Sequence, residues 1–389
     1  MKRKTLQLLT VVFLIAGINT LYAQTTQPEP INVVTTAVPF LRISPDARAG
    51  GMGDLGLATS PDANSVFWNL AKIPFAANKS GAGLTYTPWL KDLGLNDVYL
   101  MAASGYYQLD ELSAIGASIR YFSLGDITFT DGLGNGLGEG RPRELGIDAG
   151  YARKLSDRMG LGIALRFIHS NLVGNYADQN NTYQAGNAVA GDISFFYNSG
   201  RESGEGWNFG ATLTNLGSKI GYTTDATQRD YIPANFSLGT AYTKVFDESN
   251  KITFGLDLHK LLVPTPPIDT DDDFQDSVNI SNYRSKGVVS SWFSSFGDAP
   301  GGFSEELKEF QVSIGAEYAY NNLFFARAGY FYEDKLKGNR KYFTIGIGLK
   351  YNVIGLNFSY LVPSGSNNNR NPLSNTLRFG LLFDIDDSN

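Results

Sequence analysis

The sequence predicts an all-β protein, a 14-stranded antiparallel transmembrane β-barrel with an N-terminal non-barrel segment. From about residue 80 to 384, apolar residues recur at every second position, which is the period of a strand with one buried face. Fourteen such stretches occur, and bacterial outer-membrane barrels have an even number of strands. The links between the stretches alternate between short and long, as they do when turns lie on one side of a membrane and loops on the other.

The composition excludes several other classes of protein. The 389 residues include 25 Phe, 21 Tyr, 4 Trp and 43 Gly, too much aromatic residue and glycine for an ordinary helical enzyme. Cysteine is absent, and His169 and His259 are the only histidines, which excludes disulfides, thiolate nucleophiles and Cys-ligated metals. No apolar run of 18 residues follows residue 23, so a bundle of transmembrane helices is excluded as well.

Residues 1–23 have the features of a secretory signal peptide. Three basic residues begin the chain, an apolar stretch runs from Leu8 to Ile18, and Ala23 supplies a small residue for cleavage. Loss of the three basic residues takes the net charge from −6 to −9. A chain with no basic stripe is not expected to bind nucleic acid.

Residues 24–79 form an N-terminal segment without strand alternation. The segment contains the Gly-rich stretch 49–53 and a short helix candidate at 65–72, with Asp62 or Asn64 as its N-cap. Because it precedes the first strand, we expect a periplasmic or plug segment that folds into the barrel mouth or braces it.

The barrel domain, 80–389, contains the fourteen predicted strands. In 251 to 260, Phe254 and Leu256 alternate with Gly255 and Asp257, so we expect the first pair to face lipid. Ten residues tilted by about 40° rise roughly 25 Å, which matches the apolar band of an outer membrane. The strands are expected near 80–89, 97–108, 112–124, 143–154, 159–171, 186–198, 206–215, 232–246, 251–261, 310–320, 323–332, 342–351, 353–362 and 373–384.

Charged residues of the opposite parity are expected inside the barrel. Two interpretations stay open: a ladder of paired ions that fills the interior, and a selectivity lining for a polar solute. The residues are Arg120, Asp148, Arg166, Asp192, Asp257, Glu317, Arg327, Lys350 and Arg378.

No motif in the sequence supports catalysis or a cofactor. His169 and Ser170 are adjacent, so a strand points their side chains to opposite faces. The glycines between 132 and 140 precede no helix that could bind phosphate. The acidic run 269–276 lacks the Gly and Glu of a calcium-binding EF-hand loop, which leaves loose calcium binding and a solvated acidic run both open. We expect no enzyme activity, no catalytic residue, no cofactor and no defined metal site.

The predicted extracellular loop 262–309 is far longer than the other loops. Loops of this length are usually functional or disordered. Its second half is rich in apolar residues, which either bind a partner or pack back on the barrel mouth. The residues expected to bind a partner are Trp292, Phe293, Phe296 and Phe303.

Three stretches carry a resemblance to a known family. They are Ser-Pro-Asp-Ala-Arg-Ala-Gly-Gly-Met-Gly-Asp at 44–54, Leu-Leu-Val-Pro-Thr-Pro-Pro at 261–267 and Phe-Gly-Asp-Ala-Pro-Gly-Gly-Phe-Ser-Glu-Glu-Leu at 296–307. With them the chain resembles the PorV (LptO) family, outer-membrane barrels of the type IX secretion system of Bacteroidota. A fourth stretch, Trp-Asn-Leu-Ala-Lys at 68–72, has Leu70 where the family usually has Pro.

The resemblance implies a fold, a location and a function. The fold is a 14-stranded barrel of the fatty-acid-transporter type in the cell outer membrane. Members dock on the type IX translocon, bind the C-terminal signal domain of secreted cargo, and shuttle it to the attachment complex at the cell surface. The expected partners are therefore the translocon, cargo, attachment complex components and outer-membrane lipid. Two rivals remain, an outer-membrane transporter for hydrophobic small molecules and an enzyme acting on lipopolysaccharide.

Overall fold

A computed structural model describes residues 32–91, 94–130, 132–173, 183–201, 204–225, 227–268, 272–363 and 375–385. All of them belong to one compact unit, Asn32–Asn389. The predicted signal peptide lies outside the described residues, as do Asp269 and Asp271 of the acidic run.

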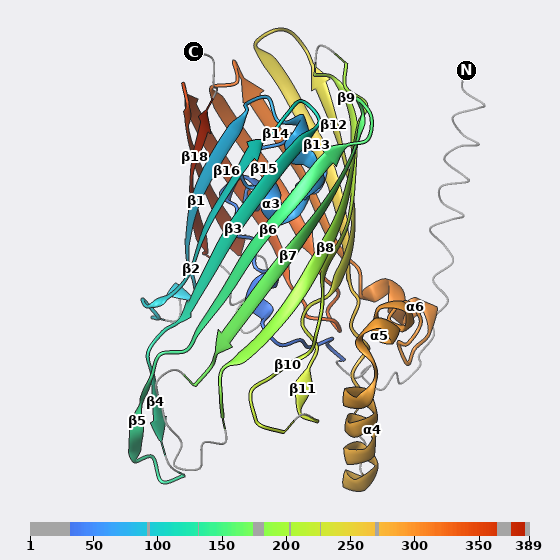
Figure 1. Cartoon of the computed structure of the whole chain (residues 1–389). Helices are drawn as coiled ribbons and strands as arrows, with labels where there is room; N and C mark the ends of the chain where they lie inside the picture. Colours follow the sequence, from blue (N-terminus) through green and yellow to red (C-terminus); the bar gives the residue numbers. More distant parts are fainter. Residues whose placement is uncertain are drawn as a thin grey trace, which may run out of the picture. The chain divides into compact units, whose positions relative to one another are not determined.

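Fourteen antiparallel strands form a closed barrel in which β1 pairs with β18, which confirms the predicted fold (Figure 1). Two short hairpins, β4 (Ile127–Thr130) with β5 (Gly136–Gly140) and β10 (Ile220–Gly221) with β11 (Arg229–Asp230), extend from long loops. The barrel strands are β1 (Ser80–Pro88), β2 (Val98–Gln108), β3 (Ser113–Leu124), β6 (Arg143–Lys154), β7 (Met159–Asn171), β8 (Gly186–Asn198), β9 (Gly206–Gly217), β12 (Asn235–Val245), β13 (Asn250–Leu261), β14 (Gln311–Tyr320), β15 (Phe324–Tyr332), β16 (Lys341–Tyr351), β17 (Ile354–Pro363) and β18 (Leu377–Ile385).

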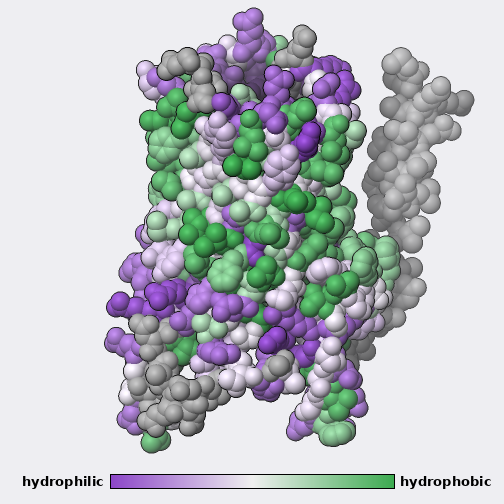
Figure 2. Space-filling model, viewed as in Figure 1, coloured by the Kyte–Doolittle hydropathy of each residue, from purple (hydrophilic) through white to green (hydrophobic). Residues whose placement is uncertain are grey.

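The strands face as the alternation predicts. In β13, Phe254 is 53% exposed and Leu256 37%, whereas Asp257 is fully buried. Figure 2 shows apolar residues gathered over the middle of the visible face, with polar residues toward both ends. β12 starts at Asn235 rather than at residue 232, because Pro233 has no N–H to donate to a neighbouring strand.

Short turns lie at one end of the barrel, together with Ser80 and Ile385, and long loops lie at the other. The long loop after β13 contains three helices that the sequence did not predict, namely α4 (Asp273–Ser285), α5 (Val288–Ser294) and α6 (Phe303–Lys308). No helix in the described part of the chain is long and apolar enough to cross a membrane.

The described N-terminal residues, 32–79, are called the plug, and most of them lie inside the barrel. The plug contains η1 (Pro39–Arg42), α2 (Ala47–Gly50), α3 (Ser65–Trp68) and η2 (Leu70–Phe75). The single helix predicted at 65–72 is thus two short helices. The chain is extended at Asn69, whose side chain accepts a hydrogen bond from the N–H of Ala71 and caps the second helix.

Candidate functional site

The plug runs through the barrel from the long-loop end to the short-turn end. At the long-loop end, Phe40 and Leu41 belong to one buried cluster with Trp89 and Phe122. At the short-turn end, η2 packs on the inner wall, and Ile73 belongs to a second cluster with Ala114 and Ala152 near the ends of β3 and β6. The plug therefore occupies the interior along its whole length.

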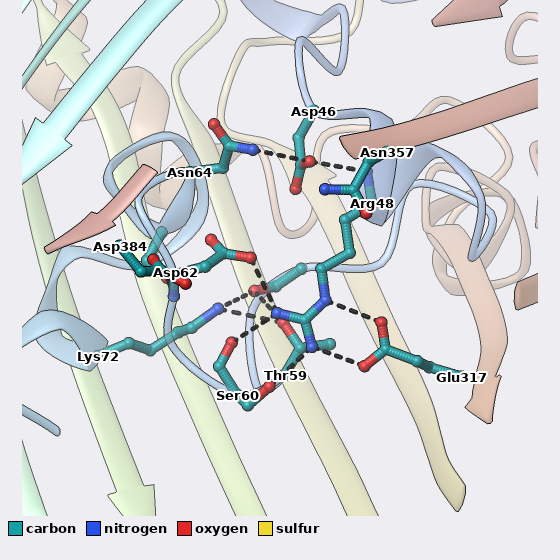
Figure 3. Close-up of polar contacts among 12 residues, drawn as sticks. Asp46, Arg48, Thr59, Ser60, Asp62, Asn64, Lys72, Glu317, Asn357 and Asp384 are labelled. Carbon is teal, nitrogen blue, oxygen red and sulfur yellow. Dashed lines mark hydrogen bonds and ion pairs between the residues drawn. The ribbon is translucent and has the colours of Figure 1, made fainter. Parts of the chain in front are cut away.

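Arg48 of the plug is held by partners on all sides (Figure 3). Its Nε donates to Glu317 Oε2 at 2.9 Å and its Nη2 to Glu317 Oε1 at 2.8 Å, while Nη1 donates to Asp62 at 2.8 Å. Ser60 accepts two further bonds from the same guanidinium. Glu317 lies on β14 and also accepts a bond of 2.6 Å from Arg327 of β15, so this cluster ties the plug to the wall.

The Gly-rich stretch lets the plug backbone touch the wall directly. Gly53 has a φ of +75°, and a Cβ there would lie 2.7 Å from the backbone of Tyr330. Only glycine takes this φ and this close approach without strain. The next residue, Asp54, accepts bonds of 2.6 Å from Arg378 and from the hydroxyl of Tyr342.

The inner wall offers further acceptors to the plug. Asp257 accepts hydrogen bonds from the backbone N–H of Gly56 at 2.8 Å and of Leu57 at 2.9 Å. Asp257 thus binds the plug rather than lining an open channel.

A buried lysine holds the plug together from within. Lys72 is almost fully buried and donates to the carbonyl of Gly56 at 2.7 Å and to Thr59 Oγ1 at 3.1 Å.

Of the two interpretations of the interior charges, paired ions describe seven of the nine residues, whereas Arg120 and Asp257 hydrogen-bond to the backbone of the plug. Arg166 pairs with Asp148 and, at 2.9 Å, with Asp192, and Lys350 pairs with Asp384 at 2.6 Å. A cavity of about 410 Å³ remains at the long-loop end and one of about 570 Å³ at the short-turn end. Buried plug residues such as Met52 and Leu55 lie in the interior alongside these pairs.

The long loop folds back over the outside of the wall. Lys260 shares the outward parity of Leu256, yet its side chain is only 1% exposed because the loop covers it. Its Nζ donates to Glu306 at 3.0 Å and to Glu309 at 2.5 Å. Lys337, from the β15–β16 loop, donates to Glu305 at 2.6 Å and to Glu309 at 3.0 Å. We call these five residues the loop clamp.

Charge pairing shifts the pKa values of two clamp residues, Glu305 and Lys337. Burial alone would raise the pKa of Glu305, but bonds from Lys337 and from a backbone N–H outweigh it and lower the pKa. Burial would lower the pKa of Lys337, but its two glutamate partners raise it. Burial raises the pKa of Asp298, which also lies in the loop, although bonds from Thr265 oppose the shift.

The four aromatics predicted to bind a partner do not share one environment. Phe293 and Phe303 are 76% and 77% exposed. Phe296 is 47% exposed and packs edge-on against Phe236 of β12 at 6.0 Å between ring centroids. Trp292 is half-buried beside Leu262 and Tyr231. Two of the four rings, Phe293 and Phe303, are therefore exposed to a partner, whereas Phe296 and Trp292 partly pack the loop onto the barrel.

The two histidines do not form a hydrolase site with Ser170. His169 faces outward, with Nδ1 2.8 Å from Asn187 Oδ1, while Ser170 is fully buried and donates to Glu144. His259 lies inside the barrel, 2.8 Å from Ser237 Oγ.

Sequence reasoning missed the plug residues that pair with the wall, above all Arg48 and Asp54, and it missed the role of Lys260. One signal for Lys260 was present, since a lysine at an outward position of an otherwise apolar strand face needs a partner.

The chain is similar to one protein family and to several solved structures. The family model described as Type IX secretion system protein PorV matches residues 25–268. The TodX deltaS2S3 mutant monoaromatic hydrocarbon channel is 13% identical with a TM-score of 0.50, covering 87% of this chain and 98% of that one. The P. putida toluene transporter TodX is 11% identical, with the same TM-score of 0.50 and the same coverage of 87% and 98%. A Pseudomonas aeruginosa FadL homologue is 11% identical, with a TM-score of 0.46 and coverage of 91% and 99%. No curated protein matches significantly.

Proposed function

The chain belongs to the PorV family and is an outer-membrane β-barrel component of the type IX secretion system, and from this membership we propose that it binds the C-terminal signal domain of secreted cargo at the translocon and shuttles it to the attachment complex. The function needs no catalysis. It needs a surface that holds cargo on the outside of the cell, where barrels of this kind place their long loops.

Two exposed aromatic residues on the long loop support cargo binding. Phe293 and Phe303 are more than three-quarters exposed on a loop that is itself held by buried ion pairs. Exposed aromatic side chains on an ordered support are favourable anchors for a protein partner, because little conformational freedom is lost on binding. The interior filled by the plug supports binding at the surface over passage of cargo through the barrel.

Copurification of cargo with a Phe293→Ser, Phe303→Ser double variant tests the proposal. If each ring contributes about 1 to 2 kcal/mol, cargo affinity should fall about 30- to 800-fold. The matched control is Phe274→Ser, because Phe274 is 77% exposed on α4 of the same loop. Full cargo recovery by the double variant, with heat-modifiable gel mobility showing a folded barrel, would refute the proposal.

A second candidate is transport of hydrophobic small molecules. The 410 Å³ cavity at the long-loop end, with Phe40, Trp89 and Phe122 in its lining, favours it. Transport requires the plug to move, so it predicts solute flux through the purified barrel, which the shuttle does not.

A further inference from the structure

An apolar groove of about 850 Å³ lies on the outer wall where the first and last strands meet. β1, β2 and β3 line one side of it, and β16, β17 and β18 line the other. Its outward side chains include Leu84, Met101, Ile119, Leu356, Phe379 and Leu381. Larger side chains surround the small residues Ala103, Gly348 and Gly380, and the groove lies between them.

The plug lies directly behind the groove. Across the floor of the groove, neighbouring strands place Thr85 opposite Gly380, Gly380 opposite Asn357, and Asn357 opposite Gly348. Because glycine has no side chain, α2 of the plug approaches the wall closely. A Cβ on Gly380 would lie 3.3 Å from that of Ala47, and a Cβ on Gly51 would lie 3.0 Å from the Cα of Gly346. The wall therefore lies against the plug on one side and forms the groove on the other.

The two polar side chains at the floor, Thr85 and Asn357, are hydrogen-bonded within the barrel. Thr85 donates to the carbonyl of Ala102, and the amide oxygen of Asn357 accepts a bond from Arg327. What the groove can bind is therefore apolar. It opens to the apolar band of the membrane-spanning wall, where the surrounding medium is hydrocarbon.

We propose that the groove is a binding site for an acyl chain of a membrane lipid, which it holds longer than the rest of the wall does. Filling the groove buries apolar surface of the chain on a concave wall, so the chain makes more contacts than it would on the convex wall. The tyrosines Tyr86, Tyr99 and Tyr121 lie together at the end nearer the long loops, which suits the interfacial region above an acyl chain. The inference does not depend on cargo binding.

The test compares two alanines that both face lipid. Ala103 lines the groove opposite Leu84, whereas Ala149 of β6 is exposed away from it. Native mass spectrometry of protein released from dioleoylphosphatidylcholine nanodiscs counts the lipid that each variant retains. We expect one retained lipid in the unmodified protein and in Ala149→Phe. The ring that Ala103→Phe places in the groove removes contacts between the chain and the wall, so we expect this variant to lose the retained lipid.

Other outcomes would overturn the inference. Equal retention by all three proteins, each folded by gel mobility, would mean that lipid contacts the groove no differently from the rest of the wall. Loss of a copurifying membrane protein from Ala103→Phe, with lipid retention unchanged, would mean that the groove is a protein contact instead.

Discussion

Arg48 and Glu317 form a bidentate ion pair inside the barrel, with N–O distances of 2.9 and 2.8 Å between residues 269 positions apart in the sequence. The pair joins a segment that precedes the first strand to the wall of β14. Because Glu317 also binds Arg327, the wall holds this acceptor in place for the plug.

Replacing Glu317 with Ala should loosen the plug. The change leaves Arg48 and Arg327 without their shared carboxylate in a buried site, a loss that typically costs about 3 to 5 kcal/mol. Urea titration of the barrel in lipid measures the stability, and planar-bilayer recording measures the conductance, which we expect to rise. Arg141→Ala is the control, because its pair with Asp126 is exposed and should contribute about 0 to 1 kcal/mol. Equal effects of the two changes would mean that the Arg48–Glu317 pair does not hold the plug in place.

Arginine at Leu256 should cost about 2 to 4 kcal/mol near the middle of the membrane. If the interior of the barrel were open, arginine at Gly255 or Asp257 would be tolerated. The plug, however, occupies the space beside both residues. A Cβ on Gly255 would lie 2.8 Å from Leu55, and Asp257 binds plug amides. The suitable control is Thr253→Arg, which lines the cavity at the short-turn end and should cost much less. Equal costs in urea titration would mean that the facing of β13 is wrong.

Gly53→Ala should destabilise the folded protein by more than about 1 kcal/mol, because the position requires a positive φ and lies against the Tyr330 backbone. Gly132→Ala serves as the control, since a Cβ at Gly132 meets nothing within 4 Å. Thermal unfolding of the two variants in the same detergent gives the comparison. If both variants unfold at the same temperature, the close approach of the plug backbone to Tyr330 does not contribute to stability.

The loop clamp should weaken in acid. Because the pKa of Glu305 is lowered in the folded protein, its carboxylate stabilises the loop fully above pH 4.5, the ordinary pKa. This stabilisation is lost as the pH falls through the lower pKa of the folded state. Because the pKa of Lys337 is raised in the folded protein, its charge stabilises the loop fully below pH 10.5, the ordinary pKa. This stabilisation is lost only as the pH rises through the higher pKa of the folded state. The raised pKa of Asp298 acts in the opposite direction, because protonation of this buried carboxyl in acid favours the folded loop.

Hydrogen exchange of residues 288–309, corrected for the intrinsic pH dependence, measures the clamp. We expect constant protection between about pH 5 and 10 and a decline below that range. Lys337→Met should lower protection at neutral pH and flatten the acid response. Protection that does not depend on pH, in both proteins, would mean that the charges do not hold the loop.

The strands could be predicted from the sequence because each one carries its own signal. The alternation in 251–261 predicts a strand observed as Asn250–Leu261, and the parity of Phe254 and Asp257 predicts their opposite faces. The helix α4 had a weaker signal, an Asp272 N-cap that bonds to the amides of Phe274 and Gln275, without an apolar stripe behind it.

The site could be predicted only in part, because its contacts join distant segments. No local pattern shows that Arg48 meets Glu317 or that Lys260 meets Glu306. The four loop aromatics were chosen by residue type, but their exposure depends on how the loop packs. Phe296 packs against Phe236, whereas Phe293 and Phe303 have more than three-quarters of their surface exposed.

We expect the barrel to bind cargo on its outer loop while the plug keeps its interior closed. The chain has no cysteine, so Ala47→Cys with Gly380→Cys introduces one pair that can lock the plug to the wall. The Cβ atoms would lie 3.3 Å apart, close to the roughly 3.5 to 4.5 Å of a disulfide. The decisive measurement is the Kd of a purified cargo signal domain for this variant, oxidised and reduced. We predict the same Kd in both states. Loss of binding on oxidation, with recovery on reduction, would mean that cargo binding requires the plug to move away from the wall.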